Sequence, residues 1–224
     1  MRVVLRIGGS VVASPINPKL ISEYAELLTT LNKQKHSLVV IVGGGRMARE
    51  MIRAAKDIGL DEPAQDDIAI SVSRIFAQFF LKKLGRIACR TVPLTLQHAA
   101  ECLTKRKIVV MGGLKPGMTT DTVAALVARK VKADLLVKAT NQDGVYDKDP
   151  KNHADAMKID RLKFDDLARV FSENKHIAGI HQIIDPEAVK ILRQYRTKMI
   201  VVNGFNPENV LAAVNGQPVG TLID

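Results

Sequence analysis

Glycines, hydroxyls and carboxylates follow apolar segments at four places in this chain. Gly8-Gly9-Ser10 and Gly43-Gly44-Gly45 come first, Thr119-Thr120-Asp121 is the third, and a polar loop over 140–150 is the fourth. Glycine lets backbone N–H groups approach an anion because no Cβ stands in the way, and a helix start adds a favourable dipole. The two glycine turns therefore suit phosphates, and the threonine hydroxyls suit a further phosphate or a sugar.

Acidic and basic side chains in these segments extend the same chemistry. Arg49 lies one turn into the helix expected after the triple glycine and offers a fork of donors. Carboxylates suit Mg²⁺, which often bridges nucleotide phosphates. The sequence has no Walker A motif. These loops also lack a Cys–His or Ser–His pair that would indicate a covalent nucleophile. Phosphoryl transfer needs only positioning and electrostatics, so these residue types are sufficient for it. The alternative interpretation is that the glycine turns bind nothing and the threonines only cap helices.

The elements that must position these residues alternate between strand and helix. The apolar run at 38–42 is typical of a strand buried on both faces, as in a parallel sheet. Strands are predicted at 2–7, 38–42, 86–92, 107–111, 135–139, 158–159, 198–202 and 220–223, and helices at 20–31, 46–58, 64–84, 95–103, 124–131, 164–171, from 184 onward, and 207–214. Right-handed crossovers gather the loops at the carboxyl edge of the sheet, so we expect the two glycine turns to lie side by side.

Composition limits the classes of protein to consider. The chain has 224 residues, 46% of them hydrophobic and 25% charged, which predicts a single α/β domain over 1–224. A net charge of +10 suits anionic metabolites, while 4% aromatic residues and the lack of a recognition motif argue against nucleic acid. No apolar run is long enough for a membrane span. Cys89 and Cys102 lack a metal-like spacing, as do the five histidines, so the cysteines are interpreted as packing residues in a reducing cytosol.

Taken in order, the motifs resemble the amino acid kinase superfamily over essentially the whole chain, and within it the archaeal-type uridylate kinases. The resemblance rests on Gly8-Gly9-Ser10, Gly43-Gly44-Gly45 with Arg49, Gly113-x-x-x-Gly117-x-Thr119-Thr120-Asp121, Thr140-x-x-Asp143-Gly144-Val145-Tyr146-x-x-Asp149-Pro150, and Gly220-Thr221-Leu222-Ile223. It implies a three-layer αβα sandwich with an open, mainly parallel sheet. It also implies transfer of the γ-phosphate of Mg·ATP to UMP, in cytoplasmic pyrimidine nucleotide biosynthesis, by a homohexamer. The acceptor would bind to roughly residues 1–130 and ATP to roughly 131–224.

The resemblance also implies a role for individual residues. Those implied to bind ATP are Gly9, Ser10, Gly45, Arg49, Thr140, Asn141, Tyr146 and Asp149. Those implied to bind UMP are Gly44, Asp66, Leu114, Lys115, Pro116, Gly117, Met118, Thr119 and Thr120, with Asp66 reaching the ribose. The implied catalytic residues are Arg6, Asp121 and Asp185. Arg6 would neutralise charge on the transferring phosphoryl group, and the two carboxylates would organise Mg²⁺, carried by ATP, or the basic groups around it.

Several positions depart from the family's pattern. Arg6 stands where many relatives have lysine, Ala69 replaces an expected glycine, Phe76 replaces an expected asparagine, and His181 stands where small or hydroxyl residues are common. Two alternatives stay open: another small-molecule kinase of the same fold, such as an isopentenyl phosphate kinase, and a non-catalytic nucleotide-binding regulator.

Overall fold

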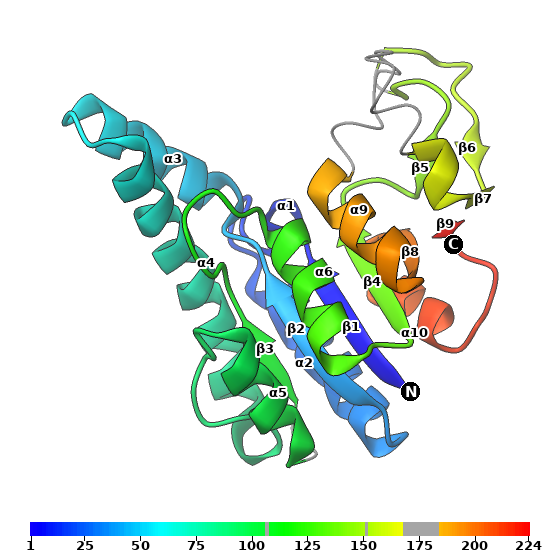
Figure 1. Cartoon of the computed structure of the whole chain (residues 1–224), viewed down its shortest axis with the longest axis horizontal. Coiled ribbons are helices and arrows are strands. Elements are labelled where there is room, and N and C mark those ends of the chain that lie inside the picture. The colour runs from blue at the N-terminus through cyan, green and yellow to red at the C-terminus, as the bar shows by residue number, and fades with distance from the viewer. Residues whose placement is uncertain (106–107, 151, 168–183) are drawn as a thin grey trace.

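The strands expected at 2–7 and 38–42 are neighbouring interior strands of a mainly parallel sheet, shown in Figure 1 for a computed structural model. The structure describes residues 1–105, 108–150, 152–167 and 184–224. Within these ranges the sheet has the order β3-β2-β1-β4-β8-β9-β7, and only β8 and β9 run antiparallel. Its strands are β1 (Arg2–Ile7), β2 (Ser37–Val42), β3 (Val109–Met111), β4 (Leu135–Thr140), β7 (Arg161–Leu162), β8 (Lys198–Asn203) and β9 (Thr221–Ile223).

Helices cover both faces of this sheet (Figure 1). The helices are α1 (Gly9–Val12), α2 (Pro18–Lys33), α3 (Gly45–Asp57), α4 (Glu62–Leu84), α5 (Leu96–Thr104), α6 (Thr120–Val131), α9 (Pro186–Tyr195) and α10 (Glu208–Val214). Side chains of α2, α4 and α10 form one apolar core, and those of α5, α6 and α9 form the other. The expected three-layer αβα fold is therefore confirmed.

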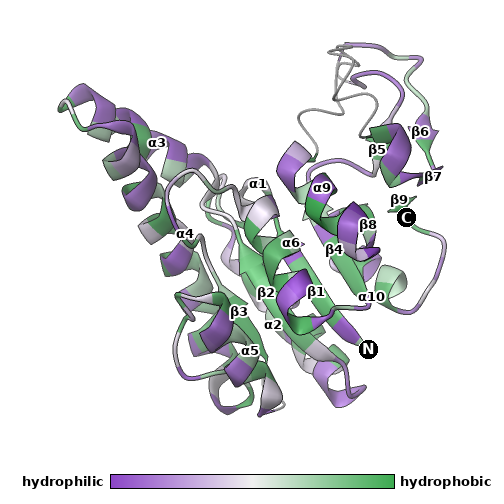
Figure 2. Ribbon diagram, in the orientation of Figure 1, coloured by the Kyte–Doolittle hydropathy of each residue, from purple (hydrophilic) through white to green (hydrophobic). Residues whose placement is uncertain are grey.

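Alternation along β1 shows why the central strands read as continuous apolar runs. Val3 and Leu5 pack into the core formed with α2 and α4, whereas Val4 packs into the core formed with α6 and α9. A strand covered on both faces needs apolar residues at every position, unlike a strand with one solvated face. Figure 2 shows the result as hydrophobic strands flanked by helices whose outer surfaces are hydrophilic.

The prediction of a strand at 86–92 is wrong. The segment begins as a 3₁₀ turn, Gly85–Ile87, and then makes only an isolated bridge between Ala88 and Ile108. Gly85 has φ +60°, which turns the chain away from α4, and Arg90 is exposed beside the edge of the sheet. The segment thus has the side chains of a strand without a strand partner along its length.

Other segments differ from expectation in smaller ways. The predicted strand at 158–159 forms as β6 (Lys158–Ile159), but it pairs with β5 (Val145–Tyr146) outside the main sheet. Of the helix expected at 164–171, residues 164–167 are helical and the rest fall outside the described residues, as does His181. The interpretation of Cys89 and Cys102 as separate packing residues is also wrong, because the structure joins them by a disulfide. Their pairing depends on how α5 packs, which spacing along the chain does not reveal.

Candidate active site

The two glycine turns lie against each other at the carboxyl ends of β1 and β2. These strands pair in parallel with Ile7 opposite Val42, and the Gly43 N–H donates to the Ile7 carbonyl at 3.0 Å. A Cβ on Gly9 would lie only 2.0 Å from the backbone nitrogen of Gly45, which itself has φ +59°. The expected juxtaposition is confirmed, and only glycine allows the two turns to approach so closely.

A cluster of three charged side chains lies beside these turns. Arg6 on β1 and Lys138 on β4 are opposite each other in the parallel register, and both reach Asp121 in the first turn of α6. The Nε atom of Arg6 is 2.7 Å from Asp121 Oδ1, and Lys138 Nζ forms an ion pair with Asp121 Oδ2. Arg6 also donates through Nη2 to Thr120 Oγ1 at 3.0 Å, and a Cβ on Gly8 would lie 2.9 Å from Arg6 Nη1. The cluster therefore adjoins the first glycine turn.

Burial and charge shift the pKa values of this cluster in ways that follow from its geometry. Burial alone would raise the pKa of Asp121, but the neighbouring charges of Arg6 and Lys138 overcome it and hold that pKa below its usual range. Burial lowers the pKa of Lys138 to about 8, with the charge of Arg6 acting in the same direction and the attraction of Asp121 opposing it. Two cations and one carboxylate leave the cluster with a net positive charge when all three are ionised.

Asp185 is joined to the same helix start from another element. It caps α9, where its Oδ1 accepts the Glu187 N–H at 2.9 Å, and its Oδ2 accepts the Thr122 hydroxyl at 2.6 Å. The Thr119 hydroxyl donates to the same carboxylate oxygen, and Thr119 also caps α6 by accepting the Thr122 N–H. The first turn of α6 thus unites the two carboxylates that the resemblance singled out.

The loop between β3 and α6 is tied to α4 by three side chains. Asp66 accepts the Gly117 N–H at 2.7 Å, and Ser73 accepts the Gly113 N–H at 2.8 Å. Arg74 donates to the carbonyls of Gly113 and Leu114 at 3.1 and 2.9 Å. The structure thus brings Asp66, on α4, into contact with the 114–120 loop, and their expected role in binding UMP stays a prediction. Of that loop's other residues, Leu114 and Met118 pack partly against the core, Lys115 is exposed and Pro116 is half-buried.

The residues expected to bind ATP lie in two groups. Thr140 is the last residue of β4, and Asn141 follows it. The hydroxyl of Tyr146 is 3.5 Å from Asp143, whose other oxygen accepts from Asn203 at 2.8 Å. Asp149 is buried, and its carboxylate accepts from Asn152 at 2.9 Å.

The other group belongs to the glycine turns. Ser10 is half-buried in α1 and Gly45 starts α3. Arg49 is exposed on α3 and forms no ion pair with any residue in the described ranges. Its guanidinium is not drawn into the cluster around Asp121.

Lys138 is the residue of this site that the sequence analysis missed. It sits in β4, where every residue is buried, and the residue is itself only 4% exposed. A lysine inside an apolar strand is itself a signal, since a buried charge needs a partner. Ser73 and Arg74, which tie α4 to the loop before α6, were missed as well, because a serine and an arginine within a long helix give no such signal.

Comparison with known proteins identifies the family of this chain. Residues 1–203 match the amino acid kinase family. The chain is 40% identical to a uridylate kinase of Archaeoglobus fulgidus over 223 residues, covering 100% of both, and 37% identical to one of Methanobrevibacter smithii, covering 100% of this chain and 99% of the relative. The crystal structure of the Archaeoglobus fulgidus uridylate kinase superposes with a TM-score of 0.89 at 38% identity over 100% of each chain. A Bacillus anthracis UMP kinase shares the fold, with a TM-score of 0.85 at 23% identity over 100% of this chain and 95% of that one. The chain belongs to the amino acid kinase family.

Proposed function

We propose that the chain is a UMP kinase, which transfers the γ-phosphate of ATP to UMP and releases UDP and ADP. The observation that carries the proposal is the Arg6–Asp121–Lys138 cluster, which joins the glycine turns to the start of α6. A net positive cluster beside phosphate-sized backbone turns suits a transferring phosphoryl group, whose transition state carries dispersed negative charge. The full-length similarity to archaeal uridylate kinases supports UMP as the acceptor.

In this mechanism the side chains position and stabilise, and none forms a covalent intermediate. The glycine turns with Ser10 and Arg49 would hold the ATP phosphates, while Asp66 and the 114–120 loop would hold UMP. An oxygen of the UMP phosphate would attack the γ-phosphorus in line, without a general base, because that phosphate is already largely ionised near neutral pH. Arg6 and Lys138 would stabilise the charge on the phosphoryl group during transfer.

The carboxylates fit an indirect role toward Mg²⁺. Both oxygens of Asp121 face cations, and Asp185 already accepts from two threonine hydroxyls and a backbone N–H. Carboxylates whose oxygens already have these partners are better suited to positioning the groups around Mg²⁺ than to binding Mg²⁺ directly. We infer that Mg²⁺ arrives with ATP, where it neutralises charge on the β- and γ-phosphates when bound.

The remaining expectations are part of the same proposal. They are a homohexamer, a cytoplasmic location, a role in pyrimidine nucleotide biosynthesis, and the division into an acceptor part (1–130) and an ATP part (131–224). Their support is the resemblance to the family. No helix in the described ranges is both long enough and apolar enough to cross a membrane.

The test is ATP consumption by the purified protein with Mg²⁺ and a panel of UMP, CMP, dUMP, AMP and isopentenyl phosphate. We expect turnover mainly with UMP. Turnover with isopentenyl phosphate alone would move the assignment to the alternative kinase, and no turnover with any acceptor would refute the proposal. Asp121→Asn separates an enzyme from a regulator, because an enzyme should lose turnover while still binding nucleotide, whereas a regulator has no turnover to lose.

A further inference from the structure

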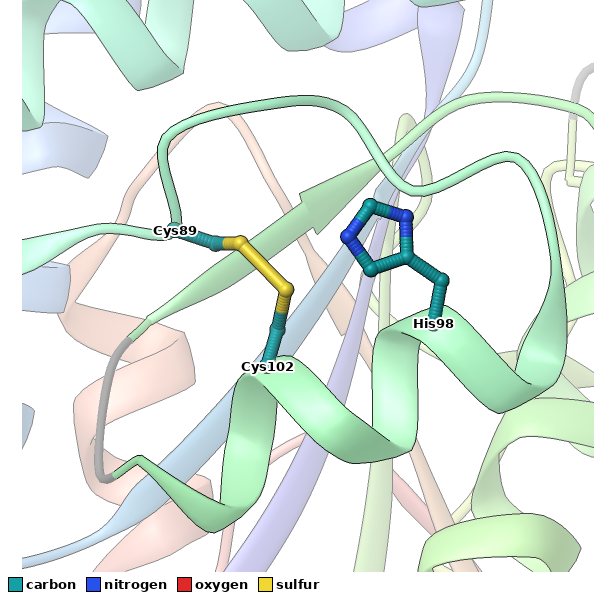
Figure 3. A group of neighbouring side chains, drawn as sticks. All are labelled: Cys89, His98 and Cys102. Carbon is teal, nitrogen blue, oxygen red and sulfur yellow. A yellow bond between two sulfur atoms is a disulfide. The ribbon is translucent and has the colours of Figure 1, made fainter.

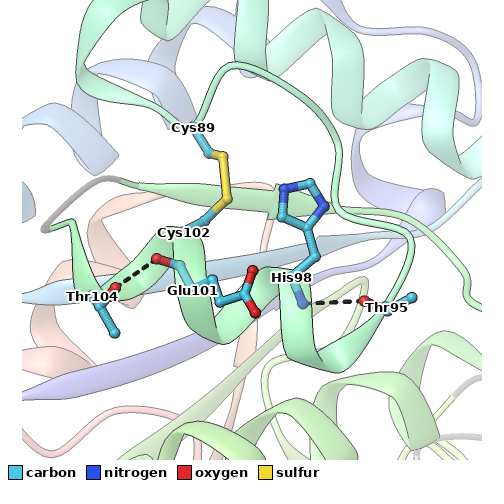
Figure 4. The surroundings of a disulfide bond; sticks show 6 residues. All are labelled: Cys89, Thr95, His98, Glu101, Cys102 and Thr104. Carbon is cyan, nitrogen blue, oxygen red and sulfur yellow. Dashed lines mark hydrogen bonds between the residues drawn. A yellow bond between two sulfur atoms is a disulfide. The ribbon is translucent and has the colours of Figure 1, made fainter.

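Two sulfur atoms and an imidazole lie close together where α5 packs against the segment that precedes it: Cys102 and His98 are on α5, and Cys89 is in the preceding segment (Figure 3). The Sγ atoms of Cys89 and Cys102 and a ring nitrogen of His98 all lie within 4.8 Å of one another. The structure joins the two cysteines by a disulfide, with His98 beside it (Figure 4). The same three side chains form a group of potential metal ligands when the disulfide is reduced.

The backbone holds the three residues together whether or not the sulfur atoms are bonded. His98 and Cys102 are four residues apart on α5, so one helical turn places them on the same face. The His98 N–H donates to Thr95 Oγ1 at 3.1 Å, which caps the helix (Figure 4). The Cys89 N–H donates to the Ile108 carbonyl at 2.8 Å, and the Cα atoms of the two cysteines are 6.0 Å apart.

The ligand types favour a soft or borderline metal ion. Two thiolates and one imidazole suit zinc, whose bonds to sulfur and nitrogen are about 2.3 and 2.0 Å long. In a tetrahedral site such ligand atoms lie about 3.3–3.8 Å apart. The three ligand atoms here already lie within 4.8 Å of one another, which is close to that spacing.

The surroundings suit thiolates and leave a way in. A hollow of about 370 Å³ is lined by Cys89, His98 and Cys102 together with Arg90, Thr91 and Lys105. The positive charges of Arg90 and Lys105 favour the thiolate form of a neighbouring cysteine. No carboxylate is among the lining residues that the structure describes, so hard cations such as Mg²⁺ have no matching carboxylate donors among them. The hollow leaves room for water as a fourth ligand.

We propose that Cys89, Cys102 and His98 bind one zinc-like metal ion when the cysteines are reduced, and that the disulfide and the metal exclude each other. Binding releases the two thiol protons. Disulfide formation instead removes two electrons from the sulfur atoms, which a small-molecule disulfide such as oxidised glutathione accepts to give two thiols. In a reducing cytosol the dithiol form is the one expected to prevail.

The experiment compares metal uptake by tag-free full-length protein in two states. One sample is reduced with a phosphine and the other is oxidised with oxidised glutathione; free thiols are counted in each, and reagent is removed before equilibrium dialysis against Zn²⁺. We expect the reduced protein to retain about one zinc per chain and the oxidised protein to retain none. With Co²⁺ in place of Zn²⁺, the reduced protein should show sulfur-to-metal charge-transfer absorption.

Three variants make the result specific. Cys102→Ser and His98→Ala should each lose the retained zinc, and Cys102→Ser should weaken the charge-transfer band. His153→Ala removes an exposed histidine away from the group and should bind like the parent protein. Equal uptake by the oxidised and reduced proteins, uptake unchanged in both ligand variants, or no uptake by the reduced parent would each overturn the proposal. Circular dichroism of every variant confirms that a loss of zinc is not a loss of fold.

Discussion

Replacing Lys138 with methionine tests the central electrostatic argument. The side chain is 5% exposed, and methionine has a similar length without the charge. If Lys138 stabilises the transferring phosphoryl group, kcat should fall by about 10²- to 10³-fold, or about 2.7–4 kcal/mol, as for other preorganised donors. Asp121 would keep Arg6 as a partner, so the loss of folding free energy should stay below the about 3–5 kcal/mol of a fully broken buried ion pair.

The pH dependence of folding stability and of kcat/KM provides a second test of Lys138. Because burial lowers the pKa of Lys138 to about 8, the native protein loses this proton while the unfolded chain, near the ordinary lysine value, still holds it. The unfolded state then binds more protons above pH 8, so this group makes the folding free energy more favourable as pH rises from about 8 to 10. Whereas this group makes folding more favourable as pH rises, kcat/KM should decline by about tenfold for each pH unit above 8.

Lys130→Met is the matched control, because Lys130 is exposed on α6 and outside the cluster. Steady-state kinetics with UMP across pH 6–10, together with urea unfolding of each variant, would separate catalysis from stability. The reasoning is refuted if Lys138→Met keeps kcat within about threefold of the parent protein and its profile still declines above pH 8.

Two further substitutions test the acceptor loop and the scaffold. Asp66→Ala removes the acceptor of the Gly117 N–H, so the KM for UMP should rise by about 10- to 150-fold, equivalent to about 1.4–3 kcal/mol, while the KM for ATP stays unchanged. An equal rise in KM for both substrates would contradict this. Tyr24→Phe removes a buried hydroxyl that donates to the Gly204 carbonyl at 2.8 Å, so unfolding free energy should fall by about 1–3 kcal/mol with kcat unaltered. An unchanged urea midpoint would show that this hydrogen bond does not stabilise the fold.

The central sheet could be predicted from sequence because its strands need no partner to be recognised. A run such as 38–42 is apolar at every position, and only a strand covered on both faces requires that pattern. The adjacency of the glycine turns then follows from a right-handed crossover between neighbouring parallel strands. The prediction of a strand at 86–92 was wrong because its side chains resemble those of a strand, whereas strand formation depends on a neighbouring strand that the sequence does not identify.

Pairs of side chains were harder to predict than elements. A buried lysine at 138 calls for an anionic partner, but the partner is Asp121, which reaches it only because α6 begins beside β1. Cys89 and Cys102 likewise meet through the packing of α5, and the spacing of His98 and Cys102 on one helical face was the signal available in advance. Sequence thus indicated which residue types were unusual, and tertiary packing decided what they contact.

The start of α6 explains how one short turn can serve the whole site. Thr119 caps the helix and contacts Asp185, Thr120 accepts from Arg6, and Asp121 pairs with both Arg6 and Lys138. The carboxylate cancels one of the two cationic charges, which lowers the repulsion between Arg6 and Lys138 enough for both to remain at one place. The charge left over, together with the positive end of the helix dipole, is what a transferring phosphoryl group can neutralise. This net positive charge is the reason why we propose the cluster as the group that stabilises the phosphoryl during transfer.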